Sequence, residues 1–259
     1  RTLSECQTVQ LLGISLATAL LPTLSRQTAQ RKLEDAGKTL GRATLALAAL
    51  MIPATMCMIF LAKPVVHVLL ARGAFTAEST LLTSSALIYY STGLLFFGAV
   101  KITVPVFYSM KDTRTPVKIA ISCMGLNILL NIVLTLLFIR TGFAKPLAGL
   151  ALATSISSMV NFFILRIALR RKIGAIVQSS TAAWLSMIPA GILSLLFLFL
   201  LSPHVVSAAS QSTLSGILAI LVASIAAMAL FLGVFALAGG KGARSVFSLA
   251  FRRGRIRKP

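Results

Sequence analysis

Acidic residues are scarce in this chain of 259 residues. It contains 5 aspartates and glutamates against 25 lysines and arginines, for a formal net charge of +20. The five acids all lie near the start of the chain or between its apolar runs: Glu5, Glu34, Asp35, Glu78 and Asp112. The sequence also lacks a nucleophile elbow, a glycine-rich phosphate loop and a metal-binding box. These absences argue against an enzyme.

Cysteine and histidine are equally sparse. The three cysteines, Cys6, Cys57 and Cys123, fall within or beside apolar runs without metal-ligand spacing. We therefore interpret them as small buried hydrophobic residues. His67 and His204 are far apart and have no carboxylate companions. The chain begins at an arginine and shows no signal peptide, so we expect it to be part of a longer protein.

Apolar residues, in contrast, make up 57% of the chain, with a mean hydropathy of +0.93. About 20 mainly apolar residues can span a bilayer, and seven runs reach roughly that length. The expected spans are Gln7–Leu24, Ala43–Ala62, Leu81–Tyr108, Val117–Ile139, Leu147–Leu169, Ala182–Leu201 and Leu214–Leu237. The third contains Gly93, Gly98 and Pro105, a helix-breaking residue, so we expect a kink there. The composition predicts an all-α, multi-pass membrane protein.

The basic residues predict the orientation of these spans. Nineteen lie in alternate connections and the tail, which places them on one side, and four lie on the other. By the positive-inside rule the nineteen are cytoplasmic. The amino terminus is then outside and the carboxyl terminus inside, which requires an odd number of spans. Topology thus explains the positive charge better than nucleic-acid binding does, and we expect the tail at 241–259 to meet anionic lipid.

Local signals mark several helix ends. The apolar segment Pro64–Ala71 is too short to span and predicts a short helix at the outer interface. Thr76 is a candidate cap for the next helix. Thr115–Pro116 reads as a cap followed by a proline at the first helical position. Gly142 and Pro146 indicate a turn between the fourth and fifth spans.

Lys101 lies deep inside an apolar run that begins near Leu81. A cation inside a bilayer costs from about 2.5 to above 10 kcal/mol. One interpretation is that its amine lines a polar cavity and meets an anionic substrate. The other is that the side chain reaches the cytoplasmic interface or a carbonyl at a kink. The residues alone leave both open.

Amide and hydroxyl side chains line the fourth and fifth spans. Asn127 and Asn131 are four residues apart and share one helix face. Their oxygens could bind a small cation or a sugar, although hydrogen bonds between helices are the commoner use. The fifth span carries a polar edge that includes Thr154 and Asn161.

Four strings occur together in a familiar order. They are GISLATALLPTLSR (13–26), LLARGAFTAEST (69–80), VKITVPVFYSMKDTRTPVKIA (100–120) and GLALATSISSMVN (149–161). Together they resemble the MurJ (MviN) lipid II flippases of the multidrug/oligosaccharidyl-lipid/polysaccharide exporter superfamily. The resemblance implies two six-helix lobes around a cationic cavity, followed by two extra helices. On that pattern residues 1–172 are the second lobe without its first helix, 173–240 the extra pair and 241–259 a basic tail.

The resemblance also implies a function and a site. The substrate would be lipid II, the undecaprenyl-diphosphate-linked peptidoglycan precursor, moved to the outer leaflet of the bacterial cytoplasmic membrane by alternating access. Lys101 and Ser15 would face the cavity. The cavity arginine of the family aligns near Leu3, and Arg1 lies two residues away, so Arg1 is included as a site residue. The last two spans would guide the isoprenoid tail.

A monovalent cation site is implied as well. Asn127, Asn131 and Thr154 would bind Na⁺, or the transport would couple to H⁺, and no other cofactor is expected. The expected partners are lipid II, anionic membrane lipids and the missing amino-terminal lobe, with no nucleic acid. Three alternatives stay open: an exporter of another lipid-linked oligosaccharide or drug, a non-transporting membrane scaffold, and a membrane enzyme acting on polyprenyl phosphates.

Overall fold

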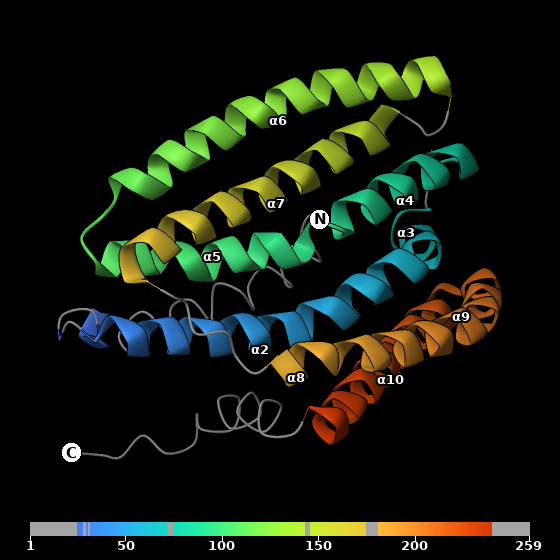
Figure 1. Cartoon of the computed structure of the whole chain (residues 1–259). Helices are drawn as coiled ribbons and strands as arrows, with labels where there is room; N and C mark the ends of the chain where they lie inside the picture. The colour runs from blue at the N-terminus through green and yellow to red at the C-terminus, as the bar shows by residue number, and fades with distance from the viewer. Residues whose placement is uncertain are drawn as a thin grey trace.

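The computed structural model describes residues 25–27, 30, 32–71, 75–142, 146–174 and 181–239. Over these ranges the secondary structure is helical, without a strand (Figure 1). The helices are α2 (Leu33–Phe60), α3 (Ala62–Leu70), α4 (Ala77–Ser91), α5 (Leu94–Ser109), α6 (Arg114–Thr141), α7 (Pro146–Ile173), α8 (Thr181–Leu185), α9 (Met187–Gln211) and α10 (Thr213–Ala238). The first expected span, Gln7–Leu24, lies outside the described residues.

The expectation of an all-α multi-pass membrane protein is confirmed. Five helices in the described part of the chain are long and apolar enough to cross a bilayer: α2, α6, α7, the α8–α9 segment from Ala183 to Ala209, and α10. The pair α4 and α5 passes the same test as one span bent by 43°. Six of the seven expected spans therefore have a counterpart.

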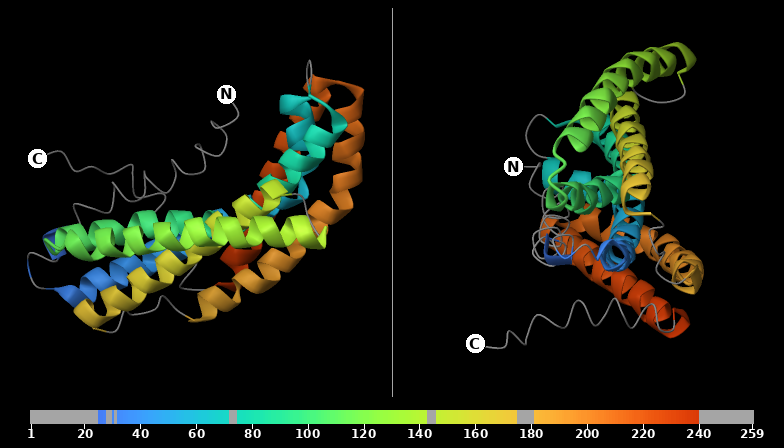
Figure 2. Two further views of the ribbon diagram at one scale, coloured as in Figure 1. Left: turned by 90° about the horizontal axis from the view of Figure 1, so that it is seen from above. Right: turned by 60° about the vertical axis from the view of Figure 1, so that its left-hand side comes forward.

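Helix α2 is the centre of the packing. One face contributes Leu40 and Leu47 to a buried cluster with α5 and α7, which includes Phe107 and Leu165. Another face carries Ala48, which packs with residues of α8, α9 and α10. In Figures 1 and 2, α6 and α7 lie beyond α5 on one side of α2, and α9 and α10 lie on the other. The spanning window of α2 is 56% buried, whereas that of α6 is 11% buried, so α6 presents most of its surface outward.

The kink expected in the third span is confirmed, and it lies at one of the three candidate residues. The helix stops at Ser91 and resumes after Gly93, while Pro105 sits inside α5 without breaking it. At the break, the hydroxyl of Ser155 on α7 donates to the carbonyls of Tyr89 and Tyr90, at 2.8 and 3.2 Å. A neighbouring helix can satisfy freed backbone groups in this way within a membrane. The Thr92 hydroxyl and the Gly93 N–H donate to the same two carbonyls, at 2.7 and 3.1 Å, so the contact with α7 adds to local hydrogen bonds at the break.

The expected start of the fourth span needs correction. Helix α6 begins at Arg114, and its N-cap, Thr113, makes no side-chain cap hydrogen bond. Instead, the backbone N–H of Thr115 donates to the carboxylate of Asp112 at 3.1 Å. Asp112, which precedes the N-cap residue, thus provides the capping interaction for the first turn. Pro116 is consequently the third helical residue rather than the first.

The sequence signals for α3, for the start of α4 and for the end of α6 agree with the structure. The short helix α3 is present, and the Thr76 hydroxyl accepts a hydrogen bond from the Ser79 N–H at 3.2 Å, which confirms the cap of α4. Gly142 ends α6 with a left-handed φ of 62°. Helix α9 continues past the predicted end at Leu201 to Gln211 and accommodates Pro203. Its greater length brings it alongside α3.

Candidate functional site

Lys101 lies on the less buried face of α5. Ile102 and Val106 on the same helix are fully buried against α2 and α7. Lys101 is half-buried, and Tyr108, two turns further along the same face, is 48% exposed. The lysine thus sits at the edge of the apolar cluster. Pro105 has no N–H, so it cannot donate the usual helical hydrogen bond to the Lys101 carbonyl.

Asn127 and Asn131 meet on α6, as their spacing predicts. The side-chain Nδ2 of Asn131 donates to Oδ1 of Asn127 at 3.0 Å. The Asn131 Oδ1 is buried and has no hydrogen-bond partner among the described residues, and the same is true of the Thr135 hydroxyl one turn later. A buried acceptor left unpaired costs about 1–3 kcal/mol. These oxygens are therefore available to a cation or to a hydroxyl donor.

The register between α6 and α7 is set by two close contacts. The Ser157 hydroxyl donates to the carbonyl of Cys123 at 2.7 Å. Further along, a Cβ at Gly149 would lie 3.1 Å from the backbone of Leu134 and Thr135. Small residues at such positions let membrane helices approach each other closely. The two helices thus run antiparallel, with 123 opposite 157 and 134 opposite 149.

This register puts Thr154 at about the level of Asn127. The Thr154 hydroxyl, however, donates to the Leu150 carbonyl of its own helix at 3.0 Å. On the same helix, Asn161 has a buried Oδ1 with no hydrogen-bond partner among the described residues. The structure brings the asparagine pair together, and the participation of Thr154 in a cation site stays a prediction. The cavity residues Arg1 and Ser15 lie outside the described residues.

An ion pair joins the end of α7 to the turn between α5 and α6, at one end of this helical group. Lys172 at the end of α7 donates to the carboxylate of Asp112, in the turn between α5 and α6. Together with the hydrogen bonds from Thr115, this amine holds the pKa of Asp112 well below its usual range. The sequence placed Asp112 between two expected spans but did not predict the pair. The available signal was a lone acid in a turn, with basic residues at the end of a later span.

The Asp112 pair predicts a specific pH dependence. An aspartate of ordinary pKa near 3.9 whose folded pKa is lower stabilises the folded protein above about pH 4, and this contribution is lost as the pH falls. We expect Asp112→Asn, which can still cap α6, to lose about 1 kcal/mol at neutral pH, because the pair is partly exposed. Thermal unfolding in detergent between pH 3 and 7 measures it. Glu34→Gln, at a more exposed pair with Lys38, should change little; an unchanged pH profile for Asp112→Asn would contradict the prediction.

Comparison with known proteins identifies the family. The sequence model described as "Lipid II flippase MurJ" matches residues 7–224. The probable lipid II flippase MurJ of Vibrio cholerae serotype O1 is 37% identical over 155 residues, covering 60% of this chain and 28% of that protein. The lipid II flippase MurJ of Burkholderia cenocepacia is 33% identical over 165 residues, covering 62% and 30%.

A solved structure supports the same assignment. The lipid II flippase MurJ in an inward closed conformation superimposes with a TM-score of 0.59 and 25% sequence identity, covering 90% of this chain and 46% of that one. The chain therefore spans less than half the length of these proteins. Because the family match includes most of the chain, the chain belongs to the lipid II flippase MurJ family and is a multi-pass protein of the bacterial cytoplasmic membrane.

Proposed function

We propose that this chain provides the carboxyl-terminal part of a lipid II flippase. It would help to move the undecaprenyl-diphosphate-linked disaccharide-peptide from the cytoplasmic to the outer leaflet by alternating access. The family match over residues 7–224 is the observation that carries the proposal. Since the chain spans 28% of the Vibrio cholerae relative, we propose that transport also needs an amino-terminal lobe, on the same polypeptide or on another. The role is that of a transporter and not an enzyme.

The helices divide into two functional parts in this proposal. Residues 1–172 form the lobe that lines the transport cavity, and residues 173–240 form a peripheral pair that guides the isoprenoid tail. Supporting this division, α9 and α10 pack on a face of α2 different from the one that meets α5 and α7. Both also expose large apolar side chains such as Ile192 and Ile225, at 65% and 67%. The tail at 241–259 would contact anionic lipid.

Lys101 is the proposed contact of the substrate's diphosphate. An ammonium is a compact point charge that binds phosphate oxygens without a fixed geometry. Its place at the edge of the buried cluster lets the amine meet a ligand without breaking the packing of α5 on α2. Ser15 and Arg1, which are outside the described residues, would join it on the cavity wall.

Asn127, Asn131 and Thr154 are the proposed ligands of a coupling Na⁺, or of a hydrated proton in its place. Hard cations take oxygen ligands from amides, carbonyls and hydroxyls. The unpaired Oδ1 of Asn131 and hydroxyl of Thr135 support this proposal. In the proposed site, these two oxygens would coordinate the bound cation.

Exchanging Asn131 for leucine tests the cation site. In wild-type protein, Na⁺ at 100 times its dissociation constant should stabilise the fold by about 2.7 kcal/mol relative to choline. In Asn131→Leu this gain should vanish. Thermal unfolding in detergent with NaCl or choline chloride measures it, and Thr141→Val, at an exposed position of the same helix, should keep the gain. Equal Na⁺ effects in wild type and Asn131→Leu would remove Asn131 from the site.

The transport role is tested by growth. A bacterial strain depleted of its own flippase should recover when the open reading frame that encodes this chain is expressed, and accumulated lipid II in the inner leaflet should fall. If the expressed protein restored growth and also moved O-antigen lipids or drugs equally well, the result would favour an exporter of broader substrate range. No recovery, with the protein present in the membrane, would favour a non-transporting scaffold.

A further inference from the structure

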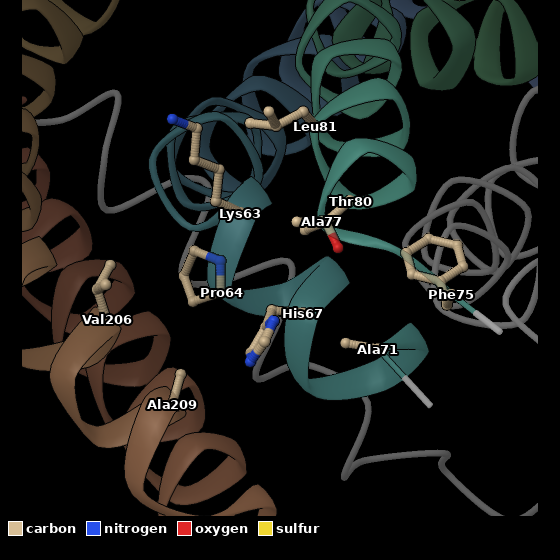
Figure 3. A pocket seen from close by; sticks show the side chains of 10 residues that line it. All are labelled: Lys63, Pro64, His67, Ala71, Phe75, Ala77, Thr80, Leu81, Val206 and Ala209. Carbon is tan, nitrogen blue, oxygen red and sulfur yellow. The ribbon is translucent and has the colours of Figure 1, made fainter. Parts of the chain in front are cut away.

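A pocket at one end of the molecule has no part in the proposed transport site. It has a volume of about 520 Å³ and lies among α3, the start of α4 and the last turns of α9 (Figure 3). Ten side chains line it: Lys63, Pro64, His67, Ala71, Phe75, Ala77, Thr80, Leu81, Val206 and Ala209. This volume falls within the range of small-molecule sites in proteins, about 300–1,000 Å³.

The pocket lies at the end of spanning helices, where a membrane surface is expected. Helix α3 follows directly on the end of the spanning helix α2, and α4 begins a few residues later. In Figure 1 this corner also contains the connection between α9 and α10. The count of basic residues predicts this end to be the outer one. We therefore expect lipid headgroups at the level of α3 and acyl chains beside the neighbouring turns of α4 and α9.

The lining combines an apolar wall with two nitrogen-bearing side chains. Leu81 and Val206 are 50% and 53% exposed, so their apolar surface is open to a ligand. Lys63 and His67 are exposed and lie four residues apart on α3, which puts their Cβ atoms about 5–6 Å from each other. Both are hydrogen-bond donors, and no acidic side chain is among the ten that line the pocket. This pattern is complementary to an anionic head joined to a hydrocarbon chain.

We propose that this pocket binds one anionic phospholipid. The phosphate would contact Lys63 and His67, and one acyl chain would lie against Leu81, Phe75 and Val206. The proposal depends on the membrane location of the chain and not on lipid II transport. It assigns a binding function to α3, a helix that the spans themselves do not require.

The pocket is held by neighbouring packing rather than by the lipid alone. Val66 and Val68 of α3 are buried, as is Ala209 of α9. At the adjoining turn, the Ser215 hydroxyl donates to the Ala208 carbonyl at 2.8 Å, which ties the start of α10 to the end of α9. Because the walls are fixed in this way, a lipid would enter a preformed site and lose less affinity to reorganisation.

Bromolipid quenching of tryptophan fluorescence tests the proposal at the pocket itself. The single tryptophan, Trp184, is first replaced by phenylalanine, and Leu81→Trp is introduced as a reporter. The protein is reconstituted into vesicles of phosphatidylcholine containing brominated phosphatidylglycerol or brominated phosphatidylcholine. Brominated phosphatidylglycerol should compete for the reporter about fivefold better, the factor expected for about 1 kcal/mol from a basic residue near a membrane surface.

Matched variants assign the selectivity. The double variant Lys63→Gln, His67→Gln should lose the preference for brominated phosphatidylglycerol, with a ratio of about one. Lys63→Arg should keep the preference. His204→Gln, at an exposed histidine on α9 outside the pocket, should also keep it. A Val222→Trp reporter, at a residue of α10 that is 65% exposed, should show no preference for either headgroup.

Three results would overturn the proposal. Equal quenching by both brominated lipids at Leu81→Trp would show an apolar groove without headgroup recognition. A preference unchanged by the double substitution would place the anion elsewhere. Displacement of brominated phosphatidylglycerol by a few molar equivalents of undecaprenyl phosphate would assign the pocket to isoprenoid lipids instead. Each readout is independent of whether the chain supports transport.

Discussion

Lys101→Ala is expected to abolish growth of flippase-depleted cells that depend on this chain. Removing one partner of a buried, charged contact costs about 2–5 kcal/mol, much of it from the charge left unpaired. Here the unpaired group would be the diphosphate of the substrate inside the membrane. Lys101→Glu should be at least as severe because it adds repulsion, and Lys101→Arg should retain part of the activity because it keeps the charge. Colony formation after depletion measures the effect.

Control variants separate transport from folding. Lys101 lies at the edge of the apolar cluster, so Lys101→Ala should leave protein level and thermal unfolding close to those of the wild type. Lys118→Ala removes a lysine from an exposed position near the start of α6 and should support normal growth. Full growth with Lys101→Ala would exclude this lysine from the mechanism. It would leave interfacial snorkelling as the explanation of its place in the span.

Gly93→Ala, at the break between α4 and α5, is expected to destabilise the fold. A Cβ at Gly93 would lie 2.7–2.9 Å from the Oγ, Cα and Cβ atoms of Ser155. Because one of these atoms is backbone, α7 must move away from the break between α4 and α5. Overpacking of this kind costs about 1–3 kcal/mol. The displacement would also remove the Ser155 hydrogen bonds to the Tyr89 and Tyr90 carbonyls. The decrease in unfolding temperature in detergent measures the combined effect of overpacking and lost hydrogen bonds.

Gly125→Ala is the matched control. Gly125 lies within α6, and a Cβ there meets no atom of the described structure within 4 Å. Replacing a helical glycine by alanine at such a position should stabilise the protein by roughly 0.5–1 kcal/mol. Opposite signs for the two substitutions would confirm that the effect at Gly93 comes from contact with α7. Similar small effects at both positions would show that the helices are less tightly packed there.

Much of the candidate site could be predicted from spacing along one helix. The bond between Asn127 and Asn131 follows from their separation of four residues, and the cap at Thr76 follows from a local hydrogen-bond rule. Both interactions depend on residues within one turn of each other. The pair of Asp112 and Lys172 could not be predicted in this way, because its partners are 60 residues apart and meet only when α7 packs beside α5.

The membrane class was determined by the sequence itself, because burying backbone in lipid requires long apolar helices whatever their packing. The bend of the third span was also foreseeable, since glycine and proline weaken a helix locally. Tertiary structure decided which of three residues bends it. Pro105 sits in a continuous helix, whereas at Gly93 the close approach of α7 requires a glycine and adds Ser155 as a further donor to the carbonyls at the break. The pocket beside α3 likewise depends on the third dimension, because its walls come from segments that only the folded chain brings together.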